Sequence, residues 1–149
     1  VSDPGLAARR AAFAAVPSRL DGSGYTVVTL VDELTKLADQ AAASLAPVHE
    51  REVADLDARV AAAGERGSGR KTLEDRHKRE IRRYRTDELR SGLAVIAGVY
   101  RDALVQGRSS RPDAAAHAVS RIHQALDALE RNPNESLLLQ HLLLELPSV

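Results

Sequence analysis

The chain has 149 residues, and its 21 Lys and Arg balance its 21 Asp and Glu, so its formal net charge is zero. A neutral chain of this length does not indicate nucleic acid or a membrane surface as the partner of the whole molecule, and no apolar run reaches the roughly 18 residues of a membrane span. The absence of cysteine excludes disulfides and thiolate chemistry and is compatible with a cytoplasmic location.

The composition favours one helical domain. Hydrophobic residues make up 44% and charged residues 28% of the chain, which is typical of a globular protein, and Ala, Leu, Arg and Glu favour helix. We therefore expect a single all-α domain over 1–149, with 1–20 as a helical linker leading into a bundle over 21–149. The chain starts with Val1 and contains no Met, so we expect a fragment of a longer protein or a processed chain.

The first half of the sequence predicts a short helix and then a long one. Ser2 and Asp3 before Pro4 are typical of a helix N-terminus, and the helix is expected to end at Pro17. From Val27 onward, apolar residues recur at steps of three and four, which predicts a helix over Val27–Ala63. Pro47 within it either starts a new helix or kinks this one.

The next helix is expected over Thr72–Gln106. Its first half is strongly charged and its second half is mostly apolar, so it should project at its start and be buried toward its end. Paired with Val27–Ala63, it forms a long central antiparallel hairpin. With the two helices that follow it, the predicted bundle contains about five helices.

The chain closes on a leucine-rich segment. A helix is expected from Pro112 to the break at Asn132–Asn134, and a last helix is capped by Asn134 or Ser136. The last helix is apolar on most of its circumference, because it carries Leu137, Leu138, Leu139, Leu142, Leu143, Leu144 and Leu146. Such a helix belongs inside a bundle or between subunits. Either other helices of the same chain cover it fully, or part of it forms a subunit interface.

The residues do not predict a catalytic or metal centre. Glu74 and His77 form one E-x-x-H step, but a helical di-iron site needs a second, which no other histidine provides. His117 and His123 are six residues apart and do not share a helix face well enough for zinc. There is no phosphate-binding loop and no serine nucleophile motif. We therefore predict no enzyme activity, metal or cofactor, and we interpret each histidine as a surface or interface residue.

Charge is segregated along the hairpin. Residues 66–85 carry nine Lys and Arg against three acids, whereas residues 32–65 carry eight acids against three bases. Opposite charges on two antiparallel helices would attract each other across the hairpin. Two alternatives remain open, an acidic protein partner and nucleic-acid phosphates contacted by Arg76, Arg79, Arg82 and Arg83.

Two blocks carry a resemblance to a known family. They are KTLEDRHKREIRRYRTDELRSGLAVIAGVYRDAL, residues 71–104, and RIHQALDALERNPNESLLLQHLLLEL, residues 121–146. Together they resemble the C-terminal region of actinobacterial DNA polymerase III delta-prime subunits, a component of the sliding-clamp loader. The matching positions are Leu73, Glu74, Arg76, Lys78, Arg79, Asp87, Leu89, Tyr100, Arg101, Asp102 and Leu104. One departure is Gln140, where the family often carries glutamate.

The resemblance implies a helical collar domain that holds clamp-loader subunits together during DNA replication and catalyses nothing. The implied partners are other loader subunits of the DNA polymerase III holoenzyme. Tyr100, Arg101, His141 and Glu145 are candidate interface residues, because they place polar groups on otherwise apolar helices. The alternative function is a helical nucleic-acid-binding module that uses the basic stretch 66–85.

Overall fold

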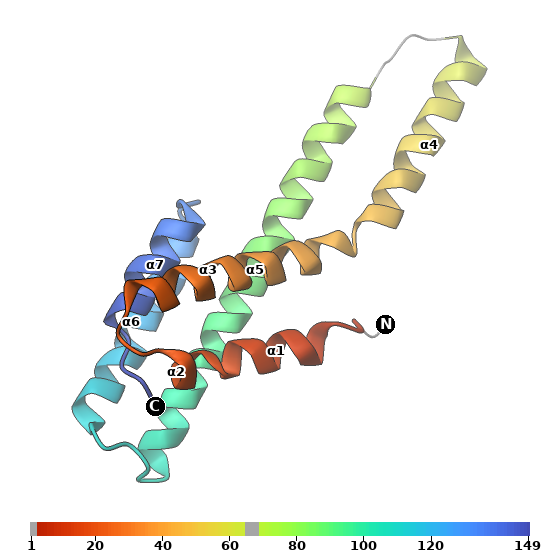
Figure 1. Ribbon diagram of the computed structural model, residues 1–149. Helices are drawn as coiled ribbons and strands as arrows, with labels where there is room; N and C mark the ends of the chain where they lie inside the picture. The colour runs from red at the N-terminus through yellow and green to blue at the C-terminus, as the bar shows by residue number, and fades with distance from the viewer. Residues whose placement is uncertain (1–2, 65–68) are drawn as a thin grey trace.

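The computed structural model describes residues 3–64 and 69–149, and within these ranges the chain is helical and contains no strand. The predicted all-α bundle is confirmed (Figure 1). The described residues form seven helices rather than about five, because two of the expected helices are each divided. In chain order they are α1 Leu6–Ala14, α2 Val16–Arg19, α3 Gly24–Ala43, α4 Ala46–Ala63, α5 Arg70–Val105, α6 Pro112–Leu129 and α7 Glu135–Glu145.

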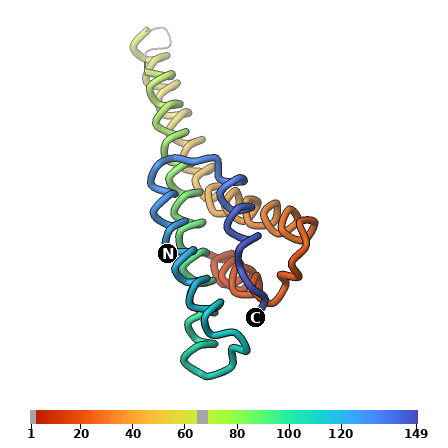
Figure 2. Tube along the Cα trace, turned by 90° about the vertical axis from the view of Figure 1, so that its left-hand side faces the viewer, coloured from red at the N-terminus to blue at the C-terminus, as the bar shows by residue number. Residues whose placement is uncertain are grey.

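Helix α5 is the spine of the molecule. Its first half runs beside α4 and projects from the bundle, and its second half packs against α1, α3 and α6 (Figures 1 and 2). Leu89, Leu93, Ile96 and Tyr100, spaced at helical intervals, are fully buried on the second half. The expectation that this helix projects at its charged start and is buried toward its end therefore agrees with the structure.

The long helix expected over Val27–Ala63 is broken at Ser44–Leu45. The Ser44 hydroxyl donates a 2.8 Å hydrogen bond to the Ala41 carbonyl at this break, and Pro47 lies in the first turn of α4. Proline is tolerated there, because the first-turn N–H groups have no partner within the helix. As a result α3 crosses α5, whereas only α4 runs alongside it as the arm of a hairpin (Figure 1).

The N-terminal segment is part of the core rather than a linker leading into it. Pro17 does not end the helical segment but lies in the first turn of α2. Phe13 of α1 and Val16 of α2 are fully buried, and Leu20 is nearly so. The prediction of a lead-in helix overlooked this, because a single phenylalanine in an alanine-rich stretch carries little periodic signal.

Gly92 allows α1 and α5 to approach closely. A Cβ atom at this position would lie only 2.2 Å from the Phe13 ring, inside the space that the ring occupies. Glycine is therefore required in the middle of α5, although it lowers helix propensity there. The contact fixes the depth at which Phe13 enters the core.

Side-chain caps set two helix starts. Ser23 accepts a hydrogen bond from the Thr26 N–H at the start of α3, and Asn134 accepts one from the Leu137 N–H at the start of α7. Asp21 accepts three further bonds, from the Ser23 N–H, the Ser23 hydroxyl and the Thr26 hydroxyl. These bonds lower the pKa of Asp21 below its ordinary value, with the Ser23 N–H contributing most.

Candidate functional site

Helix α7 has one covered face and one bare face. Leu139, Leu142, Leu143 and Leu146 are buried, whereas Leu137 is 63% and Leu144 is 60% exposed. His141 lies between the two exposed leucines at helical spacing, and its side chain is 78% exposed. Of the two alternatives for the leucine-rich helix, full coverage by the same chain is thus excluded. We call Leu137, His141 and Leu144 the α7 face.

The predicted interface residues divide between surface and core. Arg101, His141 and Glu145 are exposed, and Glu145 lies 3.4 Å from Arg121 of α6 and 3.9 Å from His141. Tyr100 is fully buried and offers no surface to a partner. Its hydroxyl donates a 2.5 Å hydrogen bond to the Pro147 carbonyl, and burial raises the pKa of Tyr100 above its ordinary value. Tyr100 therefore holds the segment that follows α7 against α5.

Residues 66–68 of the basic stretch lie outside the described ranges, and from residue 69 onward the stretch is partly neutralised by the helices beside it. Arg70 lies 3.0 Å from Asp57 of α4, Arg76 pairs with Glu52 of α4, and Arg85 pairs with Glu135 of α7 at 2.7 Å. The first two pairs, which join α5 to α4, are those that opposite charges on the two arms of the hairpin predict. Because each pair is wholly or partly exposed, each contributes little to the free energy of folding.

The four arginines predicted to contact phosphate do not act alike. Arg76 is engaged by Glu52 and lies 3.4 Å from Glu80 of its own helix. Arg79, Arg82 and Arg83 form no ion pair with any residue in the described ranges. These three line a groove between α5 and the residues that follow α6, including Asn132. The structure therefore brings three of the four candidates together on one surface.

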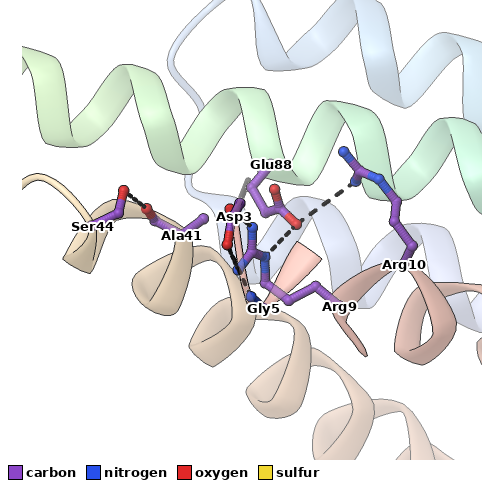
Figure 3. Close-up of polar contacts among 7 residues, drawn as sticks. All are labelled: Asp3, Gly5, Arg9, Arg10, Ala41, Ser44 and Glu88. Atoms are coloured by element: carbon purple, nitrogen blue, oxygen red, sulfur yellow. Dashed lines mark hydrogen bonds and ion pairs between the residues drawn. The ribbon is translucent and has the colours of Figure 1, made fainter. Parts of the chain in front are cut away.

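A buried ion pair that the sequence pattern does not predict joins α1 to α5. Arg9 and Glu88 are 4% and 7% exposed, and the Arg9 Nε donates a 2.9 Å hydrogen bond to Glu88 Oε1 (Figure 3). Asp3 also accepts from Arg9, and this bond lowers the pKa of Asp3. Arg10 approaches the same Glu88 oxygen at 3.7 Å. The residues are 79 positions apart, so no local pattern could have paired Arg9 with Glu88.

The interpretation of every histidine as a surface or interface residue is wrong for two of the five. His117, His123 and His141 are exposed, but His49 of α4 and His77 of α5 are 9% and 8% exposed. The two buried rings meet because α4 packs antiparallel against the first half of α5. A signal for this was present in the sequence, since both histidines are followed three residues later by glutamate.

In the part of the chain that the structure describes, these features are an all-helical bundle with a bare apolar face on α7, a groove lined with arginines and a projecting hairpin. None of its described helices is both long enough and apolar enough to cross a lipid bilayer. Comparison of the chain with protein-family models, curated proteins and solved structures found no match.

Proposed function

We propose that this chain is a non-catalytic oligomerisation domain of a DNA polymerase III clamp loader, of the delta-prime type, and that it acts in the cytoplasm. The α7 face supports the proposal most directly. An exposed leucine pair flanking a polar side chain is suited to a protein neighbour, because covering it removes apolar surface from water. Glu145, which lies 3.9 Å from His141, supplies a charged group beside this face.

Co-elution with the other clamp-loader subunits in size-exclusion chromatography tests this proposal. We expect the chain to co-elute at both low and moderate salt, because apolar contacts are only weakly affected by ionic screening. Replacing Leu137 and Leu144 with serine should abolish co-elution. Val105→Ser is the matched control, since Val105 is 86% exposed at the end of α5, outside the α7 face. Failure of the unmodified chain to co-elute would rule out the proposal.

The arginine-lined groove supports a second candidate, a nucleic-acid-binding module. Arg79, Arg82 and Arg83 would contact phosphates, and binding should weaken steeply as salt increases. Replacing all three with glutamine should reduce the salt dependence by roughly one counterion per arginine. The matched control replaces Arg51, Arg59 and Arg108, which are exposed arginines outside the stretch. Equal loss of DNA binding in the two triple variants would exclude a specific role for the groove.

A further inference from the structure

A symmetric arrangement of histidine and glutamate lies between the arms of the hairpin. Helix α4 carries His49 and Glu52, and helix α5 carries His77 and Glu80, each pair three residues apart. The two imidazole rings stack, with centroids 3.7 Å apart and planes inclined by only 11°. We call these four residues the His–Glu cluster.

The pairs cross between the helices. The His49 Nε2 atom lies 3.0 Å from Glu80 Oε2, and the His77 Nε2 atom lies 3.4 Å from Glu52 Oε1. Arg76 contacts the other oxygen of each carboxylate, Glu52 Oε2 and Glu80 Oε1. The guanidinium therefore holds the outer oxygens, and the inner oxygen of each glutamate is directed at an imidazole.

His77 is left without a satisfied partner. It is 8% exposed, and its Nε2 atom forms no hydrogen bond with any residue in the described ranges, although Glu52 is close. Leaving a buried polar nitrogen unpaired costs free energy, and a packed apolar side chain would avoid that cost. A ligand that accepts the lone pair of this nitrogen removes the cost.

We propose that His49, Glu52 and His77 bind a zinc ion between α4 and α5, with Glu80 as the fourth ligand. One ligand atom from each of the first three residues lies within 4.8 Å of the others. Imidazole nitrogen and carboxylate oxygen bind zinc tetrahedrally at about 2.0–2.2 Å, so a modest inward movement brings these three ligands onto one ion. The Glu80 carboxylate lies beside His49, outside this group of three, and must turn toward the ion to complete the site. The rings tilt out of their parallel stack so that both Nε2 lone pairs point at the ion.

The ion takes the place of a proton. His49 holds Glu80 through a hydrogen bond at Nε2. Zinc at that nitrogen displaces the proton of the bond, and the neutral ring then carries its proton on Nδ1. Glu74, the other acid of the E-x-x-H step, is not part of the site, because it pairs with Arg70 at 3.0 Å. Zinc bound in this way fastens α4 to α5, and His49 is the buried residue of α4.

Calorimetric titration of the chelator-treated full chain with zinc chloride tests the site. We expect the titration to give one zinc ion per chain. In urea denaturation, zinc should raise the urea concentration at which half of the chains are unfolded. Cobalt substituted for zinc should give the intense visible absorption of tetrahedral coordination. His49→Gln and His77→Gln should each weaken zinc binding by more than about tenfold. His117→Gln, which replaces an exposed histidine of α6, should leave the affinity unchanged.

Two results would overturn the proposal. One is absence of zinc binding, and the other is binding that persists when His49 and His77 are both replaced. Circular dichroism checks that each variant remains helical. If a histidine variant does not fold, the zinc affinity of Glu52→Gln tests the site instead, because this variant keeps both imidazole rings and removes one charged ligand. An unchanged zinc affinity in Glu52→Gln would also count against the site.

Discussion

At the scale of single residues, close contacts decide where the chain tolerates change. Gly92 is the clearest case, because its missing Cβ leaves room for the Phe13 ring. Gly98, six residues later on the same helix, meets no side chain closer than 3.9 Å. The two glycines share a helix and differ in what surrounds them, so they form a matched pair.

Gly92→Ala should destabilise the fold by about 1–3 kcal/mol, because the added methyl group overpacks the core against Phe13. Gly98→Ala should stabilise it by up to about 1 kcal/mol, because alanine favours helix and reduces the entropy of the unfolded chain. Urea denaturation of both variants measures the free energies of unfolding. Equal effects at the two positions would contradict the close contact.

Asp21 gives a pH dependence at the same scale. Its folded-state pKa is lowered by the hydrogen bonds from Ser23 and Thr26, so its contribution to stability is complete above the ordinary pKa of about 3.9. That contribution is lost as the pH falls through the folded-state pKa. Asp21→Asn should therefore be less stable than the parent chain near neutral pH, and the two should converge in acid. A difference that stays constant from neutral pH to acid would contradict this assignment.

At the scale of elements, α1 is held to α5 by the Phe13 contact and by the buried Arg9–Glu88 pair (Figure 3). A buried ion pair adds little net stability over apolar residues of the same size, but removing one partner leaves a buried charge uncompensated. Asp3 is 40% exposed and compensates Arg9 only in part. The pair therefore specifies how α1 docks on α5.

Glu88→Leu should destabilise the fold by up to about 3 kcal/mol, because the buried Arg9 then keeps only the partly exposed Asp3 as a partner. Combining Arg9→Met with Glu88→Leu should restore most of that loss, since both charges are then removed. Chemical denaturation of the two single variants and the double variant completes the thermodynamic cycle. Additive losses would show that the two side chains are not energetically coupled.

Several element boundaries could be predicted because the signals were local. Pro112 marks the start of α6, and one of the two caps considered for α7, Asn134, is the one the structure uses. The break at Ser44–Leu45 could not be predicted with certainty, because alanine-rich sequence continues across it and Pro47 permits either a kink or a new helix.

The candidate sites were harder to predict, since they join residues far apart in the chain. The exposed arginines could be recognised as a group, because they lie on consecutive turns of one helix. Which of them are neutralised depends on the register between α4 and α5, which the sequence leaves open. For the same reason, the sequence does not predict that His49 meets His77. The burial of Tyr100 depends on a different long-range contact, because its hydroxyl bonds to the Pro147 carbonyl 47 residues away.

At the scale of the whole molecule, the bundle and the projecting hairpin differ in how they are held. The core is built from α1, α2, α3, α6, α7 and the second half of α5, and it includes no residue of α4. Ion pairs and the His–Glu cluster attach α4 to its neighbour instead. Contacts of this kind stabilise less than a packed core, so the hairpin should open without the rest of the molecule.

Hydrogen exchange should resolve this difference. Backbone amides of α4 should exchange through openings of lower free energy than those of α5 between Leu89 and Ala103. Amides of α6, which packs on the same stretch of α5, serve as the internal control. Their opening free energies should equal those of the α5 amides between Leu89 and Ala103. Uniform protection over α4, α5 and α6 would indicate one cooperative unit that includes the hairpin.

Because α5 passes from the hairpin into the bundle as one helix of 36 residues, about 54 Å long, it joins the two regions mechanically. No proline interrupts it. A sideways force on the projecting end of α5 therefore bends the same helix against which the core packs. A molecule bound along the hairpin would exert leverage on the packing around Gly92, so strain applied at one end of α5 is felt at the other.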